Sequence, residues 1–469
     1  MGFEKPDRPG ERGMGLLLRI GTAATASVIL LAPAIWNRFP LLQYDTGGYL
    51  ARWYEGYLVP SRSTVYGLFL VLFARPDFWP VVIAQSLVTV WVLALLLRAQ
   101  GFGGRPLVLL ATTALLCALT TLPWLASILL TDIFAGLAVI ALYLLVFADD
   151  TLGRFERIAL VALIAFAAAT HSATFAVTAG LVLVAALAWP FVRIGSGGGI
   201  ARGAAAVALG ALMLLSANFI TSGRFVWTPG GIALSFGRML QDGIVTRYLD
   251  EHCPNAKLRL CAHRHELPTD ADEFFWGNSV FDRLGRFAGL GGEMGAIVKD
   301  SLRAYPAWQA EMAAAAVVRQ LVRVGSGEGV VNTIWHTYAI VQKFTPRAVP
   351  AMRAARQQRG EIGFEAINDI HRPIAFAAML LLIPIMGWAF RAGGPMFGVR
   401  AEAFADMSRL AAVTALSLLG NAAVCGIFAN PHDRYGARLV WLAPLVVLLA
   451  CYRAYALRPR PAAAQQPAA

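Results

Sequence analysis

The chain has 469 residues, of which 58% are hydrophobic and only 14% are charged. Such a composition excludes an ordinary soluble enzyme and predicts an all-α protein that crosses a membrane several times. The net charge of +12 fits the membrane topology proposed below, so we expect no nucleic acid among its partners.

Apolar stretches of about 20 residues predict roughly ten membrane-spanning helices. Their approximate ranges are 15–35, 79–98, 105–121, 123–147, 157–170, 173–192, 201–221, 373–390, 407–429 and 436–456. Between the ranges 157–170 and 173–192 lies Thr170-His171-Ser172. This tripeptide is either a tight external turn or a polar patch within one long helix, and we favour the turn.

The basic residues of the short connections predict the orientation, because such residues favour the cytoplasmic side. With the N-terminus inside, that side receives Lys5, Arg8, Arg12, Arg19, Arg98, Arg105, Arg154, Arg157, Arg193, Arg202, Arg391, Arg400, Arg453, Arg458 and Arg460. We therefore expect a multi-pass protein of the cytoplasmic (inner) membrane with both termini in the cytoplasm. The first apolar stretch continues past Ala32-Pro33-Ala34, so we interpret it as an uncleaved anchor.

This threading divides the chain into three parts. Residues 1–222 form an N-terminal transmembrane module whose first external loop is 36–78, and residues 373–469 form C-terminal transmembrane helices. Residues 223–372 are too polar to span and are expected to form a helical extracytoplasmic region. Together with the short turn 430–435, the loop and this region place the polar candidates on the outer face.

Two cysteines, Cys253 and Cys261, fall in the external region, and a disulfide between them is the natural interpretation outside the cytoplasm. The alternative is a metal site that uses both cysteines together with His252, His263 and His265. The spacing of these residues is irregular for zinc.

An acidic residue follows the first span directly, in Gln43-Tyr44-Asp45-Thr46-Gly47-Gly48-Tyr49, and a second lies in Thr131-Asp132-Ile133-Phe134, at the outer half of the fourth span. An early acidic external loop, many short helices and a large late external region resemble the GT-C superfamily of membrane glycosyltransferases. The resemblance covers residues 15–222 more clearly than the rest. It implies an enzyme that takes a sugar from a polyprenyl-phosphate carrier and transfers it outside the cytoplasmic membrane.

The resemblance implies a catalytic role for Asp45, which would activate the acceptor hydroxyl as a general base or help to hold a metal. The alternative is an Asp that caps a surface helix beginning near Thr46. Many members of the superfamily have two adjacent acidic residues here, whereas Thr46 follows Asp45, so a divalent metal is possible but not firmly expected. Asp132 is expected either to share the catalytic cavity or to pair with an Arg or His of a neighbouring helix.

A lipid phosphate donor needs cations or hydrogen-bond donors near the outer surface. The candidates are Arg62, His171, Arg224, His432 and Arg434. Arg434 is the most attractive because its planar guanidinium can bind a phosphate through two bonds. The alternative for Arg434 is an interfacial anchor beside Tyr435.

We therefore expect a glycosyltransferase that moves a sugar from a polyprenyl-phosphate donor to an envelope glycan, lipid or protein, with inversion by a single displacement. Membrane lipids surround it. The alternatives are a transporter or flippase of an envelope lipid and a non-enzymatic assembly scaffold. Against transport, the sequence has no convincing internal repeat and its catalytic candidates gather on one side.

Overall fold

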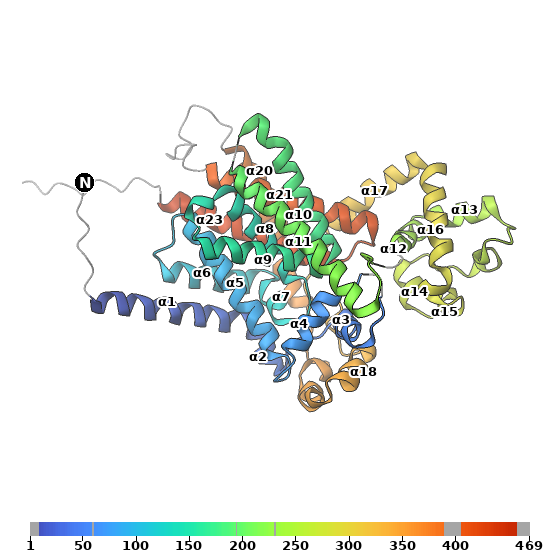
Figure 1. Cartoon of the computed structure of the whole chain (residues 1–469), viewed down its shortest axis with the longest axis horizontal. Coiled ribbons are helices and arrows are strands. Elements are labelled where there is room, and N and C mark those ends of the chain that lie inside the picture. The colour runs from blue at the N-terminus through green and yellow to red at the C-terminus, as the bar shows by residue number, and fades with distance from the viewer. Residues whose placement is uncertain (1–8, 59–60, 194, 229–230, 389–404, 457–469) are drawn as a thin grey trace, which may run out of the picture.

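The computed structural model describes residues 9–58, 61–193, 195–228, 231–388 and 405–456. Within these ranges the regular structure is helical, apart from one isolated bridge between Leu41 and Ile128. Figure 1 shows a bundle of long helices with a smaller group of helices, α12–α16, set to one side. The all-α prediction is confirmed.

The N-terminal part contains α1 (Pro9–Leu30), α2 (Ala32–Asn37), α3 (Tyr44–Glu55), α4 (Thr64–Leu72), α5 (Trp79–Ala99), α6 (Pro106–Leu119), α7 (Leu122–Ser127), α8 (Ile133–Phe147), α9 (Arg154–Thr170), α10 (Ser172–Val192) and α11 (Gly197–Ser222). The next part contains α12 (Ile232–Gln241), α13 (Ile244–His252), α14 (Ala271–Trp276), α15 (Val280–Arg283), α16 (Arg286–Ala304), α17 (Pro306–Leu321), α18 (Trp335–Phe344) and α19 (Val349–Ala354). The last helices are α20 (Glu365–Trp388), α21 (Ala405–Phe428), α22 (Asp433–Val440) and α23 (Leu442–Ala456).

Six of the described helical segments are long and apolar enough to cross a membrane. They are Trp79–Ala99, Ser172–Phe191, Gly197–Ser222, Glu365–Gly387, Ala405–Phe428 and Asp433–Ala456. The other predicted spans fall on the shorter apolar stretches Leu17–Leu30, Pro106–Leu119 and Ile133–Phe147, and on α9, which has 17 residues. The structure thus supports a membrane protein with six full-length candidate spans, and the expectation of about ten is not established.

The predicted span 123–147 is wrong as a single helix, because it is interrupted between Ser127 and Ile133. At the interruption, the amide of Leu41 donates to the Ser127 carbonyl and the amide of Leu129 donates to the Leu41 carbonyl, both at 2.9 Å. These bonds to the first external loop replace helical ones, since every buried backbone group needs a partner. Asp132 therefore lies in an irregular segment before α8 and not within a span.

The predicted turn at His171 is confirmed, since its backbone is extended (φ −152°, ψ 121°) between α9 and α10. Its ring Nδ1 accepts a hydrogen bond from the amide of Ala173 at 3.2 Å. The imidazole thus caps the start of α10, which supplies one of the amides at a helix N-terminus with a partner.

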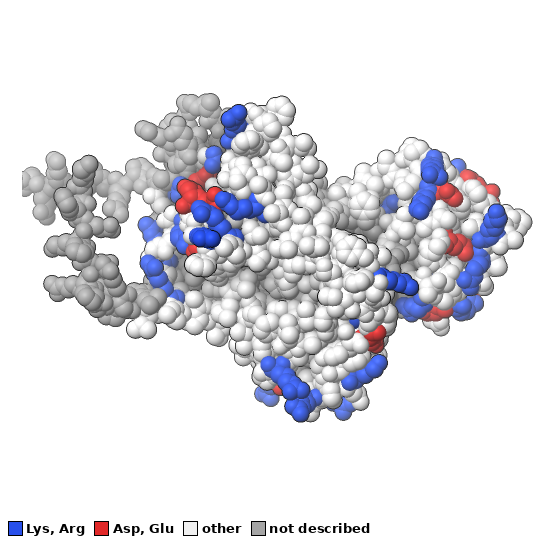
Figure 2. All heavy atoms as spheres, in the orientation of Figure 1, with Lys and Arg blue, Asp and Glu red and all other residues white. Residues whose placement is uncertain are grey.

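Ion pairs join several connections that the sequence places on the cytoplasmic side. Arg98 binds Glu156, while Arg157 and Arg202 both bind Asp149 at 2.7 and 2.8 Å. Figure 2 shows charged side chains gathered at this end and over α12–α16, with the middle of the bundle almost free of them on this face. Both termini lie outside the described residues, as do Lys5, Arg8, Arg391, Arg400, Arg458 and Arg460.

The predicted external region 223–372 consists of two parts. Helices α12–α16 enclose a core of their own, which includes Phe236, Phe274 and Phe281. The segment that follows α17 instead contributes Ile334 and Val341 to the core of the main bundle. Figure 1 accordingly shows α18 beside α3 and away from α12–α16. The external region thus brings one of its segments against the first external loop.

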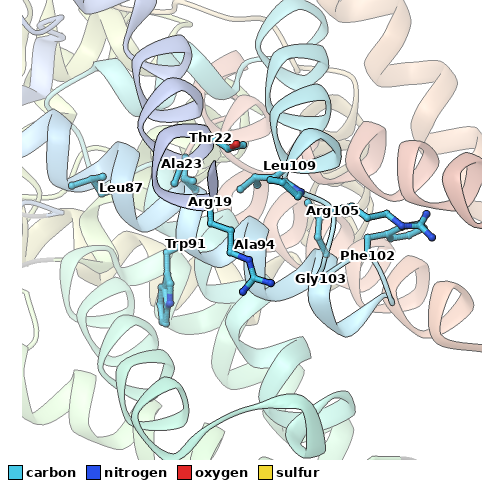
Figure 3. A pocket seen from close by; sticks show the side chains of 13 residues that line it. Arg19, Thr22, Ala23, Leu87, Trp91, Ala94, Phe102, Gly103, Arg105 and Leu109 are labelled. Carbon is cyan, nitrogen blue, oxygen red and sulfur yellow. The ribbon is translucent and has the colours of Figure 1, made fainter. Parts of the chain in front are cut away.

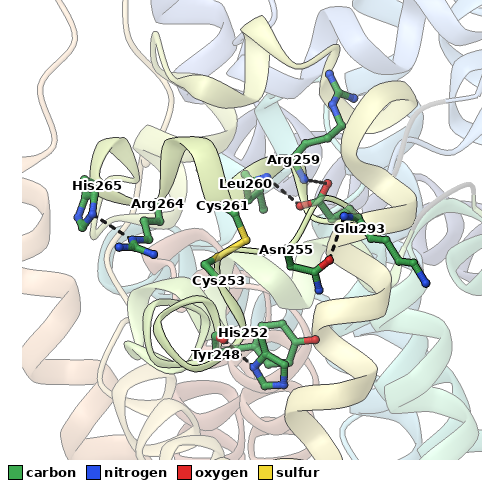
Figure 4. The surroundings of a disulfide bond; sticks show 11 residues. Tyr248, His252, Cys253, Asn255, Arg259, Leu260, Cys261, Arg264, His265 and Glu293 are labelled. Atoms are coloured by element: carbon green, nitrogen blue, oxygen red, sulfur yellow. Dashed lines mark hydrogen bonds between the residues drawn. A yellow bond between two sulfur atoms is a disulfide. The ribbon is translucent and has the colours of Figure 1, made fainter.

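The disulfide between Cys253 and Cys261 is present, as Figure 4 shows. Its loop is fixed to α16 by Glu293, which accepts hydrogen bonds from the amides of Arg259 and Leu260 at 3.1 and 2.9 Å. No group of His, Cys, Asp and Glu suited to a metal occurs in the described ranges. The alternative of a zinc site at these cysteines therefore gains no support.

We expect the double variant Cys253→Ser/Cys261→Ser to weaken this loop. Closing a loop whose ends are 8 residues apart contributes about 2.5 kcal/mol in the chain-entropy model. Amide hydrogen exchange should therefore become faster across Arg259–Glu266 and stay unchanged in α8. Cys451→Ser, which removes an exposed free thiol, is the matched control. Unchanged exchange in Arg259–Glu266 would contradict a stabilising role.

Candidate functional site

Four charged residues from distant segments meet in one buried network. Asp45, at the start of α3, forms ion pairs with Arg62, which precedes α4, and with Arg434 of α22. The Nε atom of Arg434 donates to Oδ2 of Asp132 at 2.7 Å. The side chains of Asp45, Arg434 and Asp132 are 15%, 11% and 1% exposed. The network is thus largely shielded from solvent while keeping a path to the surface at Asp45.

The residues next to Asp45 cap the start of α3, so the Asp45 carboxylate is not used as a helix cap and can pair with the arginines. Gln43 is the N-cap of α3, and its side-chain oxygen accepts from the amide of Asp45 at 2.7 Å. Thr46 Oγ1 accepts from the amide of Gln43 and donates to the Leu129 carbonyl, both at 3.0 Å. The alternative in which Asp45 caps the helix is therefore wrong, because Gln43 and Thr46 form the capping box. Thr46 also ties α3 to the segment that holds Asp132.

The two glycines after Thr46 allow close packing around the site. A Cβ at Gly47 would lie 2.7 Å from Cα of Thr337, and one at Gly48 would lie 3.3 Å from Nε of Arg62. The amide of Gly47 donates to Thr337 Oγ1 at 3.2 Å. The glycines thus let α18 and the Arg62 side chain approach α3, which explains the sequence that follows Asp45.

Arg434 is also held through its backbone. Its amide donates to Oε2 of Glu328 at 2.6 Å, and the other oxygen of Glu328 lies 2.7 Å from Nδ1 of His432. Nε2 of His432 lies 3.4 Å from Asp272 of α14. Glu328 and Asp272 therefore fix the turn before α22 to both parts of segment 223–372.

The carboxylates around His432 make it a permanent cation near neutral pH. Burial alone would lower its pKa, but hydrogen bonds and charge interactions with Asp272 and Glu328 outweigh this and raise the pKa of His432 to about 10. His432 is thus unsuited to act as a base. Its positive charge already has two acidic partners within the protein.

Burial raises the pKa of Asp45, but the Arg62 and Arg434 guanidiniums outweigh burial and hold that pKa below its usual value. Asp45 is therefore ionised in this arrangement. Each of its oxygens is occupied by an arginine, Oδ1 by Arg62 and Oδ2 by Arg434. A metal ion at Asp45 would have to displace both, so the side chains in place do not fit a metal site.

A second arginine of α22, Arg438, was not predicted from the sequence. It is fully buried and donates through Nε to Asn421 Oδ1 at 2.9 Å and through one terminal nitrogen to Nδ1 of His171 at 3.0 Å. In the described part of the chain it has no carboxylate partner. Its spacing of four residues from Arg434 could have identified it, since such residues share a helix face.

The five residues predicted to bind the donor phosphate differ in their placement. Arg62 and Arg434 bind Asp45 directly, His432 borders them, and His171 contacts Arg438. Arg224 is exposed after the end of α11, and its side chain has no polar contact among the described residues. Glu328, which organises the turn, gives no sequence signal because it lies in a loop without a motif.

A polar cavity of about 200 Å³ adjoins the network between the 430–432 turn and the external region. Its lining includes His432, Glu328, Asp272, Gln241 and Arg319. Hydrogen-bond donors and acceptors therefore lie beside the turn that precedes Arg434, as a hydroxyl-rich ligand would require.

Comparisons with models of protein families, with curated proteins and with solved structures find no match to this chain.

The ion pairs of His432 should make stability depend on pH. The pKa of His432 is raised from 6.5 to about 10, so the stabilisation that its charge provides is complete below pH 6.5 and is lost as the pH approaches 10. We expect wild type to melt at a higher temperature than His432→Gln at pH 6.5, with the difference vanishing near pH 10.

In a Glu328→Gln background, which removes one carboxylate partner, the same difference should vanish at a lower pH. A difference between wild type and His432→Gln that stays constant with pH would show that His432 does not titrate against these carboxylates.

Proposed function

We propose that this protein is a membrane glycosyltransferase of the GT-C type, which transfers a sugar from a polyprenyl-phosphate donor to an acceptor of the cell envelope on the extracytoplasmic face of the cytoplasmic membrane. The observation that carries the proposal is the placement of Asp45 between Arg62 and Arg434. Two guanidiniums arranged around one oxyanion also suit a phosphate.

In this proposal the donor phosphate and the Asp45 carboxylate compete for Arg62 and Arg434, and this competition activates Asp45. A donor phosphate that binds Arg62 and Arg434 takes over the contacts that Asp45 makes without a ligand. Losing these cations raises the pKa of Asp45, because the guanidiniums are what hold that pKa low. Donor binding would thereby convert an inert carboxylate into a competent base.

In the proposed reaction the acceptor oxygen attacks the anomeric carbon of the donor sugar. The bond from that carbon to the phosphate oxygen breaks, and its electron pair leaves with the polyprenyl phosphate. Asp45 accepts the acceptor hydroxyl proton as the new bond forms. A single displacement of this kind inverts the anomeric configuration.

Asp132 is a positioning residue in this proposal. It accepts a hydrogen bond from Nε of Arg434 at 2.7 Å and so fixes the plane of the guanidinium while one terminal nitrogen binds Asp45. Arg438 adds a buried positive charge one helical turn away, which favours an anionic leaving group.

The surroundings of the network support a lipid-linked donor and a polar acceptor. α22 and α23 together form one of the apolar candidate spans, and Arg434 lies at the N-terminal end of that candidate span. The polar cavity next to His432 lies on the opposite side, towards the external region. A lipid carrier can thus reach the network from the membrane, and a hydroxyl-rich acceptor can reach it from outside.

The proposal predicts that Asp45→Asn abolishes product formation even where its level in the membrane equals that of wild type. Removing a general base costs about 10²- to 10⁴-fold in rate. The measurement is mass spectrometry of envelope glycans and glycolipids from null cells complemented with wild type, Asp45→Asn or Asp150→Asn at equal membrane levels. Asp150 is an exposed carboxylate outside the network and provides the matched control.

A glycan that wild type and Asp150→Asn restore, and Asp45→Asn does not, would support the proposal. If Asp45→Asn restores the same glycan, the proposed base is wrong. If wild type changes no glycan, a lipid transporter or flippase, or an assembly scaffold, becomes the better explanation.

A further inference from the structure

A second cavity lies between α1, α5 and α6, at the end of α5 away from the Asp45 network. It has a volume of about 390 Å³ and is lined mainly by apolar side chains, among them Leu87, Val90, Trp91 and Leu109. Figure 3 shows these helices around it. The α5 residues that line the cavity run from Leu87 to Leu97, so with a rise of about 1.5 Å per residue the cavity begins roughly 12 Å along the helix from Trp79 and extends to roughly 27 Å.

Two arginines provide the charge at this cavity. Arg19 of α1 reaches towards Ala94 and the 102–105 turn, whereas Arg105 extends outward (Figure 3). The guanidinium carbon of Arg105 lies 5.9 Å from the ring centre of Phe102. None of the lining residues is acidic, and neither arginine forms an ion pair within the described ranges.

Three other arginines at this end of the bundle pair with carboxylates. Arg98 binds Glu156, and Arg157 and Arg202 share Asp149. The two arginines of the cavity differ from these three in lining an apolar crevice without a carboxylate partner among the described residues. A ligand that complements them must combine a negative charge with an apolar body.

We propose that this crevice binds an anionic phospholipid of the leaflet that faces the basic end of the bundle. Its phosphate lies between Arg19 and Arg105, and the first part of one acyl chain packs against Trp91, Leu87 and Leu109. Basic pockets between membrane helices recognise anionic headgroups through such charge complementarity. The site is independent of the proposed glycosyl transfer, since it shares no residue with the Asp45 network.

The test is native mass spectrometry of the full-length purified protein with two phospholipids that have the same acyl chains, phosphatidylglycerol and phosphatidylcholine. We expect wild type to retain phosphatidylglycerol preferentially. The variant Arg19→Gln/Arg105→Gln should bind it about 30-fold more weakly, which corresponds to about 2 kcal/mol for two surface arginines. Its affinity for phosphatidylcholine should change little.

The matched control is Arg154→Gln/Arg193→Gln. Both arginines are exposed, are predicted to lie on the same side of the membrane as the crevice, and do not line it. The guanidinium carbon of Arg193 lies 5.8 Å from the centre of the Trp189 ring, a contact similar to that of Arg105 with Phe102. This variant loses the same net charge and should retain phosphatidylglycerol like wild type. An equal loss in both double variants would show a general charge effect and overturn the proposed site.

A second variant tests the apolar part separately. Ala94→Phe fills the crevice and keeps both arginines, so we expect it to reduce retention of phosphatidylglycerol. Glycerol phosphate, which has the headgroup charge without acyl chains, should not compete with the lipid. Competition by glycerol phosphate, or unchanged retention in Ala94→Phe, would show that the acyl chain does not occupy this crevice.

Discussion

The end of the bundle that contains α3 and α22 depends on the ion pairs and hydrogen bonds of Arg434. Its side chain binds Asp45 and Asp132, and its amide binds Glu328. A buried guanidinium without acidic partners is strongly unfavourable, and removing one partner of a buried pair costs about 3 to 5 kcal/mol. The need to pair this one cation therefore fixes the start of α3, the irregular segment before α8 and the loop that contains Glu328 relative to α22.

The same pairing limits what the site can do without a ligand. Asp45 cannot serve as a base while two guanidiniums hold its pKa low, and the guanidiniums cannot bind another anion while Asp45 occupies them. In the proposed reaction the donor phosphate would resolve both constraints at once, because it replaces one oxyanion by another and leaves the arginines paired. Under this proposal stability and function depend on the same charges. This fits a network that is mostly buried but keeps partial solvent exposure at Asp45 and Arg62.

Hydropathy and composition predicted the helical fold, the break at His171 and the disulfide, because these depend on local sequence. Asp45 and Arg434 were identified as polar residues next to apolar spans, but their pairing was not. The interruption before Asp132 depends on bonds to Leu41, which lies far away in the sequence. Glu328 likewise acts only through tertiary contact. The expected pairing of Asp132 with an Arg or His of a neighbouring helix is confirmed by Arg434, but the sequence did not predict that the same arginine also binds Asp45.

The two ends of the bundle use arginine in different ways, and the difference follows from what surrounds each group. Arg62 and Arg434 are largely buried and face carboxylates, so only a ligand that supplies an equivalent negative charge can take their contacts. Arg19 and Arg105 are exposed beside an apolar crevice, where a lipid phosphate meets no internal competitor. Exchange of anions at the first pair can therefore be coupled to a change in Asp45, whereas occupancy at the second pair can alter only how the bundle sits among its lipids.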